Sequence, residues 1–534
     1  GAAGTLASLS HGSTGTFTNT GIVLGTTTVS AGTVALNAGS NLSDSANVTV
    51  NSGTLDVNTA ETIGSLSGSG GTVQLDGALT TGGNGGSTSF AGVFAGASDL
   101  NKAGGGVMTL TGSSSGQTGA INVNAGGLSY SGSGATTGSL DIETASGAAL
   151  NSDGGTFQTG LVITNAGTTT LTGSESIAAI TGAGGVALTG GATTLTLNGT
   201  GTNSGAISGE GSLTVAAGAT TLSGTNTYTG VTTLTGGTLD LQNGAAIADA
   251  GAVVVNAGTL TVTDAETIGS LAGAGGTVQL DAKLKTGGNN ATTSYAGLFT
   301  GAGEFEKTGT GAMTLSGLST ATGKTTVSGG TLTVSGSIGS TAVEVRQAGV
   351  LEVDGGSLAD SAAVTLNDSA KLRQSGSETI GSLTSAGSGT KVELGTGTLT
   401  TGDATSTTFA GVILGAGGLT KQGAGTMTLT NANTFTGTAN AAAGTLAVVD
   451  GGSLATTDVR TSGSGGVLTE GGALAATANV LNAGSGGLTI TGGTETVLSV
   501  NGAGKIALLG GGLTLTSGAS AISGVISGTG PLTI

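Results

Sequence analysis

A long internal repeat constrains this chain more than any local motif does. The segment that begins at Glu61, ETIGSLSGSGGTVQLDG, recurs from Glu266 as ETIGSLAGAGGTVQLDA. More diverged copies begin at Glu175, Glu378 and Glu495, so successive copies start 114, 91, 112 and 117 residues apart. Such self-similarity is the mark of architectures built by stacking or stringing equal units. The fold must therefore arise by repetition.

Short apolar alternations recur within one copy, for example at residues 253–255, 260–262 and 278–280. They are separated by short turns such as Asn256-Ala-Gly, and both Asn and Gly tolerate positive φ. Period-2 patterns of β-branched residues bounded by such turns predict strands. The turn density fits three short strands per coil and about 20–25 residues per coil, so that one copy holds roughly five coils.

Composition separates this solenoid from a string of β-sandwich domains. The 534 residues include 111 Gly but only one Pro and no Trp, whereas sandwiches of the immunoglobulin type usually carry a core Trp, a corner Tyr and several Pro. Calcium-binding nonapeptides are disfavoured because GGxGxD does not recur. We expect one continuous β-helix over residues 1–534. The fifth copy stops at residue 534 in mid-repeat, so we also expect the natural polypeptide to be longer.

Charge and rare residues narrow the function classes. The net charge is −17, and residues 1–282 hold 15 acidic residues against a single cation, Lys102. Because no basic stripe is present to neutralise phosphates, nucleic-acid binding is a poor hypothesis. The chain has no Cys and one His, His11, which removes thiol nucleophiles and Cys-based metal sites. We predict no cofactor, no metal site and no catalytic residue.

Four segments resemble a known repeat. Residues 415–448, GAGGLTKQGAGTMTLTNANTFTGTANAAAGTLAV, are similar to the autotransporter-associated β-strand repeat of passenger domains in bacterial type V secretion. Residues 96–130, 209–241 and 301–334 follow the same pattern of GxGxLxKxGxGxxTLxG, an (N)TxTG step and a closing GTLxV. The pattern departs at Val215, which replaces the usual Lys, and at Thr118, which we place at the aromatic position of the TxTG step.

This resemblance implies a right-handed parallel β-helix (β-solenoid) that serves as the exported stalk of an adhesin. It implies an extracellular or bacterial cell-surface location, and an outer-membrane translocator barrel as a partner if the chain is an autotransporter. Other implied partners are further copies of the chain, bound end to end or side by side, and ligands on host or bacterial surfaces. The family's repeats are chiefly scaffold, which favours a protein that is not an enzyme.

Three motifs resemble catalytic or phosphate-binding signatures, but a structural role explains each better. Residues 317–325, GLSTATGKT, have one residue too many for a phosphate-binding loop. Residues 112–116, GSSSG, match GxSxG but lack the strand-to-helix elbow that this motif requires. Residues 151–154, NSDG, resemble a motif of β-helical polysaccharide hydrolases, yet residues 141–175 contain no Lys, Arg or His.

Charged residues that recur in the repeat are interpreted as structural. The five copies share a Glu at positions 61, 175, 266, 378 and 495, which we expect to be a solvated turn carboxylate, paired at most with a Lys or a backbone amide. Lys102, Lys307 and Lys421 are expected to extend along the surface toward water or to form local ion pairs. Thr-rich runs such as 193–196 leave an ice-binding ladder open, which would require Thr on one face of every coil.

Three functional hypotheses remain. The first is a non-enzymatic extracellular stalk of a bacterial surface adhesin, used for display, adhesion or cell aggregation. The second is a self-assembling extracellular filament, sheath or surface layer, because unpaired strand edges at open coil ends can be continued by another copy. The third is a β-helical polysaccharide enzyme, which would require carboxylates clustered beside basic residues.

Overall fold

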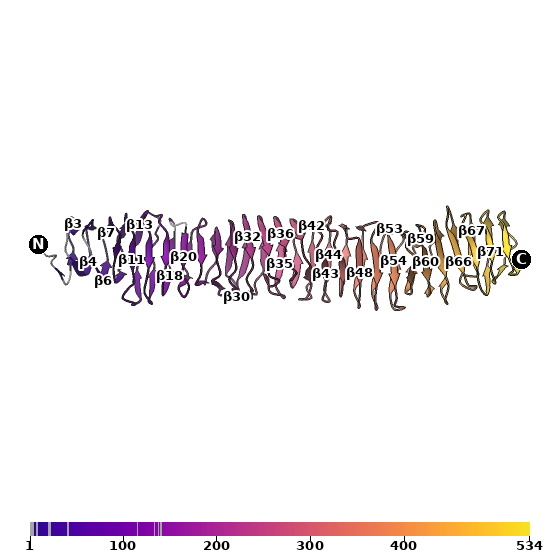
Figure 1. Ribbon diagram of the computed structural model, residues 1–534, viewed down its shortest axis with the longest axis horizontal. Coiled ribbons are helices and arrows are strands. Elements are labelled where there is room, and N and C mark those ends of the chain that lie inside the picture. Colours follow the sequence, from indigo (N-terminus) through magenta and orange to yellow (C-terminus); the bar gives the residue numbers. More distant parts are fainter. Residues whose placement is uncertain are drawn as a thin grey trace. The chain divides into compact units, whose positions relative to one another are not determined.

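The computed structural model describes residues 5–6, 9–19, 23–39, 42–114, 116–132, 134–136, 138 and 141–534. Over these residues every regular element is a β-strand, from two residues long in β8 (Glu61–Thr62) to nine in β6 (Leu42–Val50). The chain divides into two compact units, Gly1–Ile268 and Gly269–Ile534. Figure 1 draws the first from indigo to magenta and the second toward orange and yellow. No helix able to span a membrane occurs in the part of the chain that the structure describes.

A typical coil contributes one strand to each of three sheets, although some coils, such as that of residues 212–231, contain two strands. In the first unit β13 (Val93–Gly96), β14 (Leu100–Lys102) and β15 (Val107–Leu110) follow one another and belong to three different sheets. The next coil adds β16 (Gly116–Gln117), β17 (Ile121–Val123) and β18 (Gly127–Ser131) to the same three sheets. This arrangement confirms an all-β parallel β-solenoid with three short strands per coil.

Two seven-stranded sheets show how the coils of the first unit stack. Neighbouring strands in each sheet are parallel and come from successive coils. The first sheet contains β8, β11 (Leu79–Thr81), β14, β17, β20 (Asp141–Thr144), β23 (Val162–Asn165) and β26 (Ala179–Thr181). The second contains β12 (Thr88–Phe90), β15, β18, β21 (Ala149–Asp153), β24 (Thr168–Leu171), β27 (Gly185–Leu188) and β30 (Ile207–Gly209).

The second unit repeats the arrangement with a long sheet and a seven-stranded one. The long sheet runs in order through β40 (Leu284–Thr286), β43 (Phe305–Lys307), β45 (Thr325–Val327), β48 (Ala342–Val345), β51 (Ala363–Leu366), β54 (Ser382–Ser385), β57 (Thr407–Phe409), β60 (Thr426–Leu429), β63 (Thr445–Val448), β66 (Gly466–Thr469), β68 (Gly487–Ile490), β71 (Ile506–Leu508) and β74 (Ile526–Gly528). The other contains β41 (Thr293–Tyr295), β44 (Ala312–Leu315), β46 (Thr331–Val334), β49 (Val350–Val353), β52 (Lys371–Gln374), β55 (Lys391–Leu394) and β58 (Val412–Gly415).

Coil length varies while the register holds. Val162 pairs with Ala179, 17 positions later, and Ser385 pairs with Phe409, 24 positions later. Because the side-chain period of a strand is two, this register keeps the alternate aliphatic residues of successive strands on the interior face. One interior column of the second unit consists of Leu332, Leu351, Leu372, Val392 and Ile413, all at most 1% exposed. Burying each of these side chains contributes about 1.5–3 kcal/mol.

Backbone stacking explains one recurrent glycine. Gly301 and Gly415 end a strand at φ values of 93° and 111°, in the region that favours glycine. A Cβ on Gly301 would lie 2.1 Å from the carbonyl oxygen of Leu280 in the preceding coil, and one on Gly415 would lie 1.9 Å from that of Leu394. The coils therefore approach too closely at this corner for any side chain.

The register corrects one alignment made from sequence. Leu100 pairs with Ile121, and the equivalent Leu213 pairs with Thr232. The motif aromatic Tyr228 stands four positions before Thr232, so its counterpart before Ile121 is Gln117 and not Thr118. Gln117 is 1% exposed, as an interior position requires. The loop before it is one residue longer in this copy, which shifted the sequence alignment.

Candidate functional site

The recurring glutamate lies inside the solenoid in every copy. Its exposed fraction is 6% or less in all five, at Glu61, Glu175, Glu266, Glu378 and Glu495. The expectation of a solvated turn carboxylate is therefore wrong. Each of these glutamates is the first or second residue of a strand and stands two positions before a buried aliphatic residue, as Glu61 does before Ile63. This Glu-x-aliphatic spacing places the two side chains on the same, interior face.

Each glutamate accepts a backbone hydrogen bond from the preceding coil, always from the amide of a large apolar residue. The donor amides belong to Leu42 (2.9 Å, to Glu61), Phe157 (2.8 Å, to Glu175), Ile247 (3.0 Å, to Glu266), Leu358 (3.0 Å, to Glu378) and Leu474 (2.8 Å, to Glu495). Glu266 and Glu495 accept a second amide with the other oxygen, and Glu175 also accepts the hydroxyl of Ser152. The carboxyl group thus ties two coils together where the strand ladder is interrupted.

Burial raises the pKa of these carboxyl groups. Desolvation raises the pKa of Glu61 and Glu266 from 4.5 to about 7, although the backbone hydrogen bonds act in the opposite direction. The pKa values of Glu175, Glu378 and Glu495 are raised for the same reason. Perturbed pKa values often mark functional sites, but buried structural groups show them too.

Three recurring lysines are also buried. Lys102, Lys307 and Lys421 are each 1% exposed, so the expectation that they extend toward water or form ion pairs is wrong. The Leu-x-Lys or Phe-x-Lys spacing could have predicted this burial, because it places Lys102 on the same side of the strand as buried Leu100. Burial lowers the pKa of all three amines.

Backbone carbonyl oxygens surround each buried ammonium group. The Nζ of Lys102 donates to the carbonyl oxygens of Ala103 (2.7 Å), Gly104 (3.0 Å) and, in the following coil, Ala125 (3.1 Å). Lys421 donates in the same way to Gln422 (2.5 Å) and Gly423 (2.9 Å). Three donors and three acceptors satisfy the group. Val215, fully buried at the same repeat position, shows that an aliphatic side chain also fits there.

Sequence reasoning also missed a buried asparagine of the repeat. Asn226 and Asn433 open the NTYTG and NTFTG steps and are 3% and 1% exposed. Asn226 accepts the amide of Ile207 at 2.7 Å and donates to the carbonyl oxygen of Ala246 at 2.7 Å. It thereby links three coils. The Asn-x-aromatic spacing is again an alternation of interior positions.

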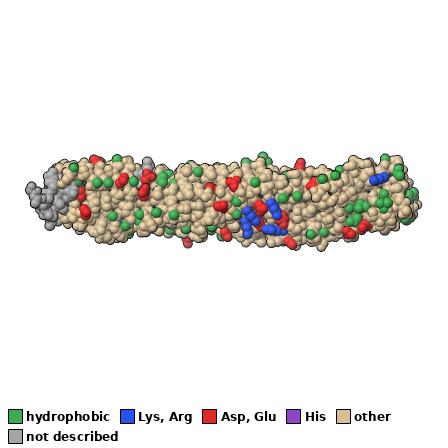
Figure 2. Space-filling view, in the orientation of Figure 1, with side chains coloured by type: hydrophobic (Ala, Val, Ile, Leu, Met, Phe, Trp, Pro, Cys, Tyr) green, Lys and Arg blue, Asp and Glu red, His purple; other side chains and the backbone are tan. Residues whose placement is uncertain are grey.

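A charged patch covers part of the second unit. Figure 2 shows Lys and Arg side chains gathered around Asp and Glu side chains on a surface that is otherwise mostly uncharged. Glu306 accepts Lys283 at 2.5 Å and Arg346 at 2.7 Å, and Lys324 pairs with Glu344 at 2.5 Å. Burial alone would raise the pKa of Glu306, but hydrogen bonds from Lys283, Ser328 and Arg346 outweigh it and lower the pKa to about 2.

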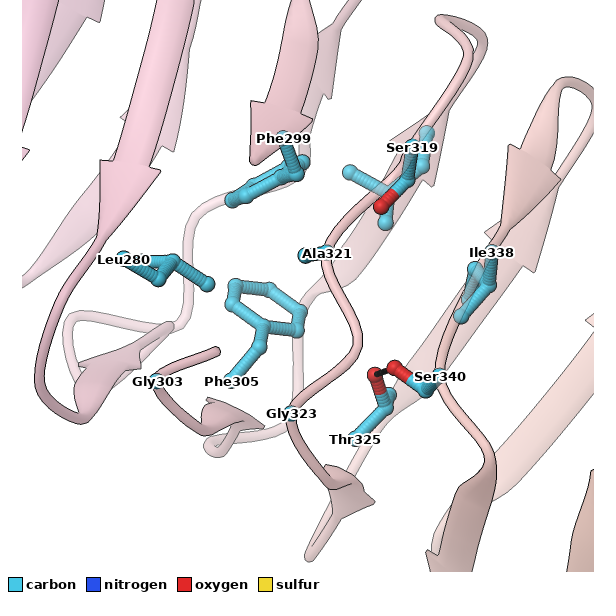
Figure 3. A pocket seen from close by; sticks show the side chains of 11 residues that line it. Leu280, Phe299, Gly303, Phe305, Ser319, Ala321, Gly323, Thr325, Ile338 and Ser340 are labelled. Carbon is cyan, nitrogen blue, oxygen red and sulfur yellow. Dashed lines mark hydrogen bonds between the residues drawn. The ribbon is translucent and has the colours of Figure 1, made fainter. Parts of the chain in front are cut away.

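An interior cavity of the second unit is too small for an organic ligand. Figure 3 shows Phe299, Phe305 and Ala321 around it, with the hydroxyl groups of Thr325 and Ser340 in contact at its edge. Its volume of about 10 Å³ suffices for about one water molecule. The cavity arises at the repeat position where Tyr228 and Phe435 stand in other copies and where this copy has Ala321.

The suspected catalytic motifs do not converge on a site. In GSSSG, Ser114 is buried and accepts the amide of Phe94, and Ser115 lies outside the described residues. His11 Nε2 lies 2.9 Å from the carbonyl oxygen of Gly15. In NSDG, Ser152 is bonded to Glu175, and in GLSTATGKT, Lys324 pairs with Glu344. Within the described ranges, no group of three or more His, Asp or Glu is placed to hold a metal ion.

An uninterrupted threonine ladder is not present on the seven-stranded sheet of β8 to β26. Its outward positions read Thr80, Asn101, Asn122, Glu143, Thr164 and Thr181 in register. Asn122 donates to Asn101 at 2.8 Å, and Glu143 interrupts the neutral row. This sheet therefore does not offer the regular Thr face that an ice-binding function requires.

Four segments of the chain match a known family of repeats. The model of the passenger-associated-transport-repeat matches residues 100–129, 208–241, 305–334 and 419–448. These are the four segments in which the sequence resemblance was found, and they contain the buried Lys and Asn positions described above. No curated protein and no solved structure matches the chain. With four such repeats set in a parallel β-solenoid, the chain is similar to the autotransporter passengers that carry this repeat.

Proposed function

We propose that the chain is a non-enzymatic extracellular stalk of a bacterial surface protein, used for display, adhesion or cell aggregation. The observation that carries the proposal is the occurrence of four passenger-associated-transport-repeats within stacked parallel coils. The recurring polar residues of the repeat hold neighbouring coils together. Lys421 and Asn433, for example, bind backbone atoms and are 1% exposed.

The proposed partners follow from the same family. An outer-membrane translocator would carry the passenger to the cell surface, and further copies or surface ligands would contact its outward face. That face is suited to many weak polar contacts, because its ladders are rich in partly exposed Thr and Asn, as in Thr109, Asn151 and Thr170. Catalysis has no part in this proposal, since each motif tested above has a structural role.

Deletion within the natural protein tests the proposal. Cells that make the protein are compared with cells in which residues 1–534 are deleted, for sedimentation and for attachment to abiotic and host-cell surfaces. The stalk hypothesis predicts that cells lacking these residues attach or aggregate less. Equal attachment and sedimentation would refute an adhesive role, and loss of an enzymatic activity would refute the non-enzymatic one.

A further inference from the structure

The buried glutamates leave part of their hydrogen-bonding capacity unused as carboxylates. An ionised carboxylate has about four acceptor positions. Glu61 and Glu378 accept one amide each from the preceding coil, from Leu42 and Leu358, and one from the next residue of their own strand, Thr62 or Thr379. None of the ion pairs formed by the described residues involves any of the five glutamates. A negative charge at these positions is therefore desolvated without a cation to compensate it.

The groups that face these glutamates make ionisation harder. Asp44 faces Glu61, Asp249 faces Glu266 and Asp360 faces Glu378, and each adds a like charge. All three aspartates are exposed. Hydroxyl groups also neighbour three of the glutamates, and those of Ser152 and Thr469 act in the opposite direction by lowering the pKa of Glu175 and Glu495.

These hydroxyl neighbours are Tyr228 beside Glu266, Ser152 beside Glu175 and Thr469 beside Glu495. Tyr228 has its own pKa raised to about 12 and stays protonated through neutral pH, so it adds no charge. We call the contact between a buried glutamate and the amide of the preceding coil a clasp. One clasp occurs in each of the five copies of the long repeat, which multiplies the effect of protonation.

We propose that these clasps make the solenoid an acid-strengthened scaffold: on acidification the buried glutamates take up protons in the folded chain before they would in the unfolded chain, and the coils become harder to separate. A protonated carboxyl group keeps its carbonyl oxygen as an acceptor for the amide of the preceding coil. It loses the desolvated charge and the repulsion from the facing aspartate. Acidification thus tightens the same contact.

The direction follows from proton linkage. The pKa of Glu61 and Glu266 is about 7 in the folded chain and 4.5 when exposed, so the folded state binds more protons between these values. Stability therefore falls as the pH rises from 4.5 to 7 and changes little from this source above 8. For one such glutamate the folding equilibrium shifts about 30-fold between pH 8 and 5.5. Glu306, Glu344 and Asp458, whose pKa values are lowered, act in the opposite direction only below pH 4.5.

Two measurements on the whole chain test the proposal. The titration of the glutamate carboxyl carbons is followed by NMR, with Glu61→Gln and Glu266→Gln used to assign the two resonances. Urea unfolding is followed at pH 5.5 and pH 8 in parallel. The proposal predicts two resonances that titrate near pH 7 and a higher urea midpoint at pH 5.5.

Matched variants separate the clasp from general charge effects. Glu61→Gln mimics the protonated form and should reduce the loss of stability between pH 5.5 and 8, whereas Gln at the exposed Glu143 should leave that loss unchanged. Asp44→Asn removes the facing charge and should move the titration of Glu61 toward lower pH. Titration of Glu61 and Glu266 near pH 4.5, or a urea midpoint no higher at pH 5.5 than at pH 8, would overturn the proposal even if Glu61→Gln failed to fold.

Discussion

Exchange of an aromatic ring between two positions of the second unit tests the packing of the repeat. Other copies place Leu213 or Leu419 beside an aromatic residue, Tyr228 or Phe435, at the TxTG step. In this copy the pair is Phe305 and Ala321, and both line the cavity of about 10 Å³ (Figure 3). We therefore infer that the ring of Phe305 fills the space that the motif aromatic fills elsewhere.

The single substitutions and their combination have different expected costs. Phe305→Leu enlarges an existing cavity and should cost about 1–2 kcal/mol, since each Å³ of cavity created costs about 24 cal/mol in addition to the transfer free energy of the removed atoms. Ala321→Phe overpacks the same space and should cost about 1–3 kcal/mol. The double variant restores the leucine and aromatic pair of the other copies, in which the smaller leucine leaves room for the ring. It should cost at least about 1 kcal/mol less than the two single variants together, and this difference is the coupling energy in favour of the pair.

Native-state hydrogen exchange measures this locally, which suits a repeat protein whose unfolding need not be two-state. The reporting amides are those of Phe305 and Thr322, which donate to the carbonyl oxygens of Lys324 and Gly301. Amides near Tyr228 in the first unit serve as the internal control. If the two single costs add to within about 0.5 kcal/mol in the double variant, the two side chains do not share one space and the reasoning fails.

Three further predictions concern the polar groups of the repeat. Lys421→Met should lower the free energy of local opening of residues 419–444, measured by hydrogen exchange, by about 1–3 kcal/mol, because three carbonyl oxygens lose their donor. Unchanged exchange would contradict the role given to the ammonium group. Asn433→Ala should cost a similar amount in the same assay, since it unpairs the amide of Ile413, and protection equal to wild type would refute that. The pKa of Glu306 is about 2, so its ionised form stabilises the folded chain above pH 4.5, and this is lost as the pH falls toward 2. Because solvent screens the half-exposed Lys283 and Arg346, the expected effect is small: Glu306→Gln should lower the free energy of unfolding in urea by about 1 kcal/mol at pH 6. At pH 2 it should have almost no effect. An equal effect at both pH values would contradict the pairing.

The solenoid could be predicted because the long repeat and the period-2 alternation together determine which side chains face the interior of each coil. The strand of residues 259–262, with Leu260 and Val262 inward, has the form expected from its sequence. The spacing of Asn and Gly turns gave the number of strands per coil. The four transport repeats were visible because their motif residues recur at fixed offsets.

The buried charges could not be predicted by treating each residue according to its type. Glu and Lys are rarely buried, and that general preference led to a solvated interpretation. The alternation contradicted it, since Glu61 and Lys102 each stand two positions from a buried aliphatic residue. Their partners are backbone atoms of other coils, which no side-chain pattern records. The Lys283–Glu306–Arg346 network likewise depends on stacking of coils up to 40 positions apart.

Surface proteolysis of intact cells that make the natural full-length protein tests the central claim most directly. Trypsin is added briefly, and released peptides are identified by mass spectrometry beside a cytoplasmic marker. The account predicts cleavage at the partly exposed Lys283, Lys324 and Arg346 before any marker peptide is released. Appearance of these peptides only after the cells are lysed would contradict the proposal that the chain is a surface-exposed passenger.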